Sequence, residues 1–281
     1  MRILKTVDAL INWRKKQSNS IGFVPTMGAL HLGHLSLVEK SIKTCSLTVV
    51  SIFINPTQFS KDEDLTSYPQ SLKEDQILLE KLHIDILFLP TEIEMYEKSS
   101  SVNIPVSNLF KKLEGVSRPH FFPGVTTIVA KLFNIVQPTH AFFGQKDAQQ
   151  LFIIKQMIKK MNYAIKLIAC PTIRDTSGLA LSSRNNYLTR KQQEKASIIY
   201  RGLLHIQKSI DEGQNNPALL KESFRVILKT IKETKVEYIS IACTTTLNEV
   251  KTIKDKKLLI STAVVFNEVR LIDNLIYQSS T

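Results

Sequence analysis

The sequence predicts a doubly wound parallel α/β sheet over residues 1–176 and a smaller α+β domain over residues 177–281. In the first part, short β-branched runs alternate with longer segments of helical spacing, a pattern typical of strands joined by crossover helices. After residue 171 this alternation stops in a polar stretch, 174–186, with the composition of an exposed loop. Sheets of this class bind ligands beyond the carboxyl ends of their strands.

The order of elements follows from local patterns. Strands are expected at 21–24, 47–53, 84–89, 139–143 and 164–169. A helix is expected at 6–16, where Thr6 can cap its start. Helices are also expected at 33–44, 71–82, 125–136 and 147–161, because their apolar residues recur three and four positions apart. In the second part, helices at 189–211 and 217–234 precede β-rich runs at 236–242, 258–265 and 270–277.

Composition argues against several classes of protein. The 37 basic and 25 acidic residues give a net charge of +12, but the excess is divided equally between the two parts, so we expect neither a nucleic-acid nor a membrane partner. Three isolated cysteines predict no disulfide framework and no structural zinc site. Without a membrane-length apolar run or a signal-peptide layout, the expected location is the cytoplasm.

The segment richest in chemical information reads VPTMGALHLGHL and runs from Val24 to Leu35. It follows an expected strand and enters an expected helix, where unpartnered backbone N–H groups and the helix dipole favour an anion. Gly28 and Gly33 have the spacing of a P-loop. His34 stands where a P-loop needs lysine, which argues against a P-loop ATPase.

Two histidines remain at this helix start. His31 and His34 are three residues apart, so both imidazoles project from one face toward the same bound group. Such a pair suits stabilisation of charge on a phosphate in a displacement reaction. The spacing alone leaves a metal-ligand pair or a coincidence open.

The motif H-x-G-H after P-T-M-G resembles the signature of the HxGH nucleotidylyltransferase superfamily, and within it the pantothenate synthetase (pantoate–β-alanine ligase) family. Further blocks resemble that family in its order and near its spacing: SIFINPTQF at 51–59, YP at 68–69, KLFN at 131–134, FGQKDAQQ at 143–150, LSSRN at 181–185 and RLIDN at 270–274. The resemblance covers nearly the whole chain.

One segment departs from the family pattern. Where the family usually reads R-P-G-H-F-x-G-V, residues 118–125 read R-P-H-F-F-P-G-V. Phe121 occupies the aligned histidine position, so no role is carried over to it. His120, one place early, is only a weak substitute.

The resemblance implies a Rossmann-like domain over 1–176 that binds ATP and pantoate, and a C-terminal lid domain over 177–281. It implies an ATP-dependent ligase that activates pantoate as an acyl-adenylate, releases pyrophosphate, and lets β-alanine displace AMP to form pantothenate, a precursor of coenzyme A. ATP would be a substrate, Mg²⁺ would assist, and the chain would form a homodimer through its N-terminal domain.

Residue by residue, the resemblance implies four kinds of role. The implied ATP-binding residues are Met27, Gly28, His31, His34, Gly144, Lys146, Asp147, Ile173, Leu181, Ser182, Ser183 and Arg184. Those implied in catalysis are His31, His34 (the matching proton donor), Lys146 and Arg184. Substrate would bind to the amides of Asn55, Gln58 and Gln150, and Mg²⁺ near Glu74 and Asp75. Cationic and hydroxyl groups suit the charge that collects on the α-phosphate and the departing pyrophosphate.

Two other functions are alternatives. A nucleotidyltransferase that adenylates a phosphomonoester would use the same H-x-G-H site, but the neutral amides at 55, 58 and 150 favour a hydroxy acid over a phosphate. A nucleotide-binding or RNA-associated module has only the net charge in its favour. The ligase hypothesis requires the imidazoles at 31 and 34 to meet the cations at 146 and 184 across one triphosphate cleft.

Overall fold

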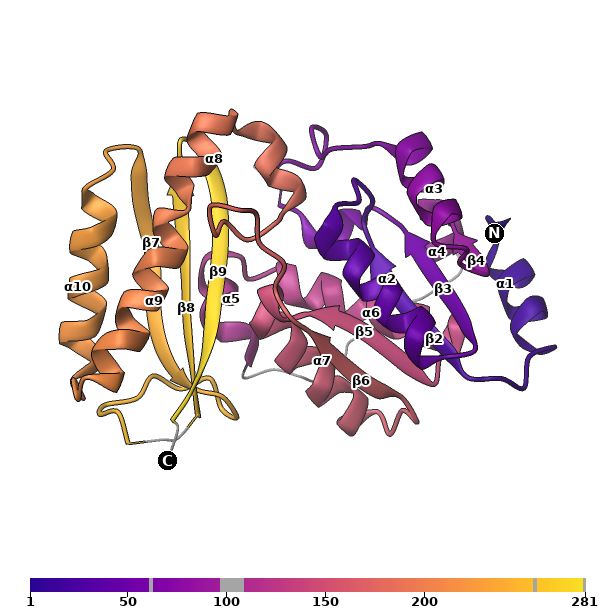
Figure 1. The fold of residues 1–281 in the computed structure, drawn as a ribbon. Helices are drawn as coiled ribbons and strands as arrows, with labels where there is room; N and C mark the ends of the chain where they lie inside the picture. The colour runs from indigo at the N-terminus through magenta and orange to yellow at the C-terminus, as the bar shows by residue number, and fades with distance from the viewer. Residues whose placement is uncertain (61–62, 97–108, 255–256, 280–281) are drawn as a thin grey trace. The chain divides into compact units, whose positions relative to one another are not determined.

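A computed structural model describes residues 1–60, 63–96, 109–254 and 257–279 of the chain. The chain forms two compact units (Figure 1). The N-terminal unit contains residues 1–111, 115–145 and 150–171. The C-terminal unit contains residues 172–281 together with two short pieces of the earlier chain, 112–114 and 146–149.

A six-stranded parallel sheet with the order β1-β4-β3-β2-β5-β6 forms the centre of the N-terminal unit. Its strands are β1 (Arg2–Leu4), β2 (Ile21–Thr26), β3 (Leu47–Ile52), β4 (Ile86–Phe88), β5 (His140–Gly144) and β6 (Lys166–Cys170). The five strands expected from the sequence are all present. The edge strand β1 was not predicted, because three residues are too few to show an alternating pattern; it pairs with β4.

Alternate residues of each strand enter two different cores, which is why helices cover both faces of the sheet. Phe23 lies in one core and Val24 in the other. The helices α2 (Leu32–Thr44) and α3 (Leu72–Lys81) contribute to the core around Val24. The core around Phe23 is completed by α1 (Val7–Arg14), α6 (Phe121–Val136) and α7 (Ala148–Lys160). The predicted doubly wound architecture is therefore confirmed.

The direction of winding changes between β2 and β5. From β2 the chain adds β3 and β4 on one side, and later adds β5 and β6 on the other. In sheets of this kind the loops that leave the strands at this switch point separate and form a ligand crevice. The two strands end at Thr26 and Gly144, so the segments beginning at Met27 and Gln145 start at this switch point.

Shorter elements connect the layers. They are η1 (Pro56–Gln58), α4 (Glu92–Tyr96), η2 (Leu109–Lys111), α5 (Glu114–Ser117) and η3 (Gln145–Asp147), the η elements being 3₁₀ turns. Helix α6 begins at Phe121, four residues before the expected start. Pro123 lies in its first turn, where a missing N–H removes no helical hydrogen bond.

The C-terminal unit has an antiparallel sheet with the order β7-β8-β9, as the predicted α+β class requires. Its strands are β7 (Thr234–Cys243), β8 (Lys257–Phe266) and β9 (Val269–Gln278), and its main helices are α9 (Ile198–Asp211) and α10 (Pro217–Lys229). Leu203 of α9, Phe224 of α10 and Ile260 of β8 share one buried core. None of the helices in the described part of the chain is long and apolar enough to cross a membrane.

The prediction of a single helix over 189–211 was wrong. Two helices occupy this stretch, α8 (Arg190–Ala196) and α9, and Ser197 lies between them. The hydroxyl of Ser197 donates to the carbonyl of Glu194 at 2.6 Å, a local bond that competes with the helical ladder. Before α8, the 3₁₀ turn η4 (Ser183–Tyr187) occupies the end of the polar stretch.

Candidate active site

The turn between β2 and α2 starts at the switch point. After Thr26 the chain passes through Gly28 (φ +83°) and Ala29 (φ +49°), two successive residues in the left-handed region. At Gly28 a Cβ atom would lie 3.1 Å from both Asp75 and Ile52. Glycine therefore meets a conformational and a steric requirement here, and its backbone is left open to a close approach.

Asp75 of α3 fixes this turn. Its side chain is buried, Oδ2 accepts a hydrogen bond from the backbone N–H of Ala29 at 2.9 Å, and Oδ1 accepts one from that of Leu30 at 2.8 Å. The hydroxyl of Ser71 donates to Oδ1 at 3.1 Å. Both carboxylate oxygens of Asp75 thus bind the chain itself, a role that the sequence did not reveal.

The expected magnesium pair has two different environments. Glu74 is exposed, whereas Asp75 is buried, because consecutive helical residues point about 100° apart around the axis. Within the described ranges, no three His, Cys, Asp or Glu side chains form a group that could hold a metal ion. These residues do not fit a dedicated Mg²⁺ site, and the expected need for Mg²⁺ stays a prediction.

His31 and His34 lie side by side at the start of α2. His31 is the N-cap: its Nδ1 accepts from the N–H of Gly33 at 3.1 Å, while Nδ1 of His34 accepts from the N–H of His31 at 3.4 Å. The ring centroids are 4.1 Å apart. Because Nδ1 is the acceptor in each ring, the proton of each neutral imidazole is on Nε2. The three-residue spacing correctly predicted that the rings adjoin; their contact with phosphate stays a prediction.

The neutral amides after β3 form a connected group. Asn55 is buried, and its Nδ2 donates to Oε1 of Gln58 at 3.3 Å and to the carbonyl of Gly124 at 3.2 Å. Its Oδ1 accepts from the hydroxyls of Thr57 at 3.0 Å and Tyr96 at 2.5 Å. Both amide hydrogens of Asn55 therefore donate within the protein, and one of them orients Gln58. Sequence reasoning missed Tyr96, whose pKa is raised by burial.

Gln58 connects this amide group to the β2–α2 turn. Its Nε2 donates to Sδ of Met27 at 2.8 Å, so two expected ligand-binding segments meet within the N-terminal unit. Gln150, the third expected amide, is half-buried in the first turn of α7. The structure thus brings Met27, Asn55 and Gln58 together, and their binding of pantoate or nucleotide stays a prediction.

Lys146 and Asp147 follow Gly144 in the turn η3. The ammonium of Lys146 lies 3.8 Å from Oδ2 of Asp147, and its carbonyl accepts a hydrogen bond from Nδ2 of Asn274 at 2.7 Å. The side chain of Lys146 is one-fifth exposed. The backbone of Lys146 is therefore held in place by Asn274, while its charged side chain reaches solvent.

The other expected phosphate-binding residues lie in a hairpin of the C-terminal unit. The N–H of Leu181 donates to the carbonyl of Ile173 at 2.9 Å, which pairs two expected nucleotide contacts. Ser182 caps η4 by accepting from the N–H of Arg184 at 3.3 Å, and Ser183 is buried beside it. The stretch expected as an exposed loop is thus a paired and capped segment.

The two expected halves of the phosphate site belong to different units. His31 and His34 are in the N-terminal unit, whereas Lys146 and Arg184 are in the C-terminal unit. Their meeting across one cleft stays a prediction.

Comparison with known proteins decides the family. The family model described as pantoate-beta-alanine ligase matches residues 2–276. The pantothenate synthetase of Syntrophomonas wolfei subsp. wolfei is 41% identical over 99% of this chain and 100% of its own, and that of Fervidobacterium nodosum is 43% identical over 98% and 99%. The chain belongs to the pantoate–β-alanine ligase family.

Solved structures of this family are similar throughout the chain. The crystal structure of pantothenate synthetase from Thermus thermophilus has a TM-score of 0.91 at 38% identity, covering 98% of this chain and 99% of that one. The pantoate-beta-alanine ligase of Francisella tularensis, complexed with beta-gamma ATP and beta-alanine, has a TM-score of 0.81 at 36% identity over 98% and 97%.

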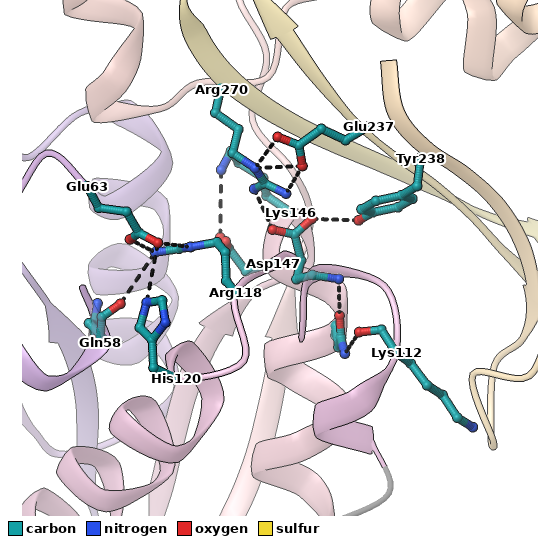
Figure 2. Close-up of polar contacts among 12 residues, drawn as sticks. Gln58, Glu63, Lys112, Arg118, His120, Lys146, Asp147, Glu237, Tyr238 and Arg270 are labelled. Atoms are coloured by element: carbon teal, nitrogen blue, oxygen red, sulfur yellow. Dashed lines mark hydrogen bonds and ion pairs between the residues drawn. The ribbon is translucent and has the colours of Figure 1, made fainter. Parts of the chain in front are cut away.

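The segment that departs from the family pattern is attached to the amide group. Arg118 donates from Nε to Oε1 of Glu63 at 2.9 Å and from its terminal nitrogen to the carbonyl of Gln58 at 3.4 Å (Figure 2). Its guanidinium lies 3.9 Å from the ring centroid of Phe121. Nε2 of His120 is 3.3 Å from Oε1 of Glu63. In this member of the family, residues 118–121 therefore support the Gln58 segment through a carboxylate and an aromatic ring.

Proposed function

We propose that this chain condenses pantoate with β-alanine at the expense of ATP, giving pantothenate, AMP and pyrophosphate through a pantoyl-adenylate. The family assignment over residues 2–276 carries the proposal. The adjoining imidazoles at a helix N-terminus on the switch point of the sheet support it, because that position favours a phosphate.

In the first step, a carboxylate oxygen of pantoate attacks the α-phosphorus of ATP, and the bond to pyrophosphate breaks. The Nε2–H groups of His31 and His34 would donate to phosphate oxygens as charge develops there. Lys146 and Arg184 would neutralise the departing pyrophosphate. Gln58, oriented by Asn55, would bind pantoate without adding charge, and Gln150 would assist.

In the second step, the amine nitrogen of β-alanine attacks the acyl carbon, the bond to AMP breaks, and the amine loses a proton. The nucleotide would be held meanwhile by the Met27–Gly28 turn, by Gly144, Asp147, Ile173 and Leu181, and by the serines at 182 and 183. An acyl-adenylate must be kept from water, so closure of the C-terminal unit as a lid is part of the proposal. X-ray scattering with and without ATP tests it: a radius of gyration unchanged by ATP and pantoate would contradict closure.

The product assay tests the function. Purified protein with ATP, Mg²⁺, pantoate and β-alanine should form pantothenate and AMP, with pyrophosphate release that depends on pantoate. Mg²⁺ is included because we propose that it enters bound to the ATP phosphates, which need few protein ligands. Release of ADP, or pyrophosphate release without pantoate, would contradict an adenylate mechanism.

Adenylation of a phosphomonoester is the second candidate. A phosphate acceptor calls for an unneutralised cation near its pocket. Arg118 contacts the carbonyl of Gln58, and its guanidinium is already paired with Glu63. Replacement of pantoate by phosphomonoesters should therefore give no pyrophosphate.

We also propose that the chain is a cytoplasmic homodimer. Light scattering measures the mass in solution, and a mass equal to that of one chain, 31.9 kDa, would contradict the dimer.

A further inference from the structure

The block RLIDN at 270–274 has no role in the reaction as derived so far, yet it holds other segments of the C-terminal unit in place. It lies on β9, an edge strand that pairs only with β8 within the described sheet. Asp273 and Asn274 are both buried there. Each side chain binds an irregular segment that lies outside the sheet.

Asp273 holds the hairpin that leads to Arg184. Its two carboxylate oxygens accept from the guanidinium of Arg174 at 2.6 and 2.9 Å. Arg174 also donates to the carbonyl of Gly178 at 3.1 Å and lies 3.6 Å from the ring centroid of Tyr200. Burial raises the pKa of Asp273, and the neighbouring Arg174 opposes that rise. The two residues form an ion pair, largely shielded from solvent, at the base of the hairpin.

Asn274 holds the segment that carries Lys146. Its Nδ2 donates to the carbonyl of Lys146 at 2.7 Å, which gives a partner to a backbone group in the 3₁₀ turn η3. At the other end of this segment, Gln149 donates to the carbonyl of Lys112 at 2.7 Å and accepts from the N–H of Glu114 at 3.0 Å. The segment 146–149 is therefore held at both ends, through the backbone of Lys146 and through the side chain of Gln149.

Arg270, at the start of the same block, binds a third segment. Glu114 accepts from Arg270 of the same block and from the hydroxyl of Tyr238 at 2.7 Å, and Glu237 binds Arg270 from the other side (Figure 2). The segments 112–114, 146–149 and 173–184 are thus all fixed to one strand by three residues of one block. Two of these segments carry Lys146 and Arg184.

We propose that Asn274 is a positioning residue for Lys146. Because Asn274 lies beside Asp273 on β9, it holds the backbone of Lys146 at a fixed position relative to the hairpin that carries Arg184. This rests on the proposed function, in which both cations act on the ATP phosphates. Groups that stabilise a transition state must be placed within a fraction of an ångström, and a displacement of about 1 Å costs on the order of 10²-fold in rate.

A double-mutant cycle tests this role. Asn274→Ala should reduce pantoate-dependent pyrophosphate release, measured as kcat at saturating ATP, by about 10-fold or more. In a Lys146→Ala background the same change should cost less than about 2-fold, because the group it positions is gone. Asn274→Asp keeps the side-chain shape, and its ionised carboxylate cannot donate to the carbonyl of Lys146, so at alkaline pH it should be impaired as Asn274→Ala is. It serves if the alanine variant does not fold.

Ser261→Ala is the matched control. Ser261 is the register partner of Asn274 on β8, and its buried hydroxyl makes no hydrogen bond to the described part of the chain, so its loss should leave kcat unchanged. Two outcomes would overturn the positioning role alone. One is an equal loss of kcat from Asn274→Ala in the wild-type and Lys146→Ala backgrounds. The other is a wild-type kcat in Asn274→Ala and Asn274→Asp while Lys146→Ala is impaired. Wild-type kcat in Lys146→Ala would overturn the proposed role of Lys146 and this inference with it.

Discussion

The carboxylate of Asp75 accepts a hydrogen bond from the backbone N–H of Ala29 at 2.9 Å, across 46 positions of sequence. Ala29 has positive φ and lies between β2 and α2. The same buried carboxylate accepts from the N–H of Leu30 as well. These bonds make Asp75 part of the turn between β2 and α2, although the family resemblance suggested a metal ligand.

Replacing Asp75 by asparagine should destabilise the turn. One side-chain oxygen would become an amide nitrogen that faces a backbone N–H, leaving a buried donor without an acceptor. We expect the free energy of unfolding to fall by about 1–3 kcal/mol and the KM for ATP to rise. Urea denaturation and pyrophosphate-release kinetics measure both.

Glu74→Gln is the control for that change, because Glu74 is the exposed neighbour on the same helix. It should alter neither unfolding nor the KM for ATP. If Asp75 acts through the turn, the Mg²⁺ concentration for half-maximal activity should be unchanged in Asp75→Asn. A large rise in that concentration with normal stability would restore the metal-ligand hypothesis.

The sequence was informative where a pattern is local. Short β-branched runs at 21–24 and 47–53 predicted strands, and the spacing of His31 and His34 predicted imidazoles on one face, because both depend on neighbours within a few residues. The parallel sheet and the smaller α+β unit were predicted correctly for the same reason.

The sequence was less informative where a side chain acts at a distance. Asp75 binds Ala29, and Asn274 binds Lys146 across 128 positions, so no local pattern records either contact. The amide hydrogens of Asn55 donate to Gln58 and to Gly124 across 69 positions, while its contact with substrate stays a prediction. The sequence identified these residues as members of family motifs. Their contacts are seen only in the folded chain, because most of the partners lie far away in the sequence.

Gly124→Ala should impair pantoate binding. A Cβ at Gly124 would lie 2.5 Å from the carbonyl oxygen of Thr57 and 2.8 Å from the backbone nitrogen of Gln58, so the amide segment would have to move. We expect a KM for pantoate raised by about 10-fold or more, since a misplaced binding group loses its contact geometry. Steady-state kinetics at saturating ATP measure it.

Gly202→Ala is the matched control, because its Cβ would collide with the ring of Phe224 in the core of the C-terminal unit. Overpacking there should cost about 1–3 kcal/mol in unfolding free energy and leave the KM for pantoate unchanged. Equal increases in KM from both glycine variants would show that the effect of Gly124→Ala is general destabilisation.

Cys243 should be the reactive thiol of the chain. A hydrogen bond from Thr245 lowers the pKa of Cys243 to about 7, whereas burial raises the pKa of Cys45 and Cys170. The thiolate is the nucleophile, so alkylation by iodoacetamide should rise with pH around a midpoint near 7 and occur first at Cys243. Mass spectrometry of tryptic peptides identifies the site, and Thr245→Val should move the midpoint upward. Earlier labelling of Cys45 would contradict this.

In the proposed function His31 has two tasks, and replacement by asparagine separates them. As the N-cap of α2 it accepts from the N–H of Gly33, and asparagine is an equally good cap; as a phosphate contact it offers Nε2–H, which asparagine cannot place at the same distance. His31→Asn should therefore keep wild-type stability while adenylation falls by about 10²-fold, the loss expected for one preorganised contact. His31→Ala should lose about 1 kcal/mol of stability in addition. His34→Ala should lose adenylation to a similar degree, and near-normal pyrophosphate release in His31→Asn and His34→Ala would mean that these imidazoles do not face the triphosphate.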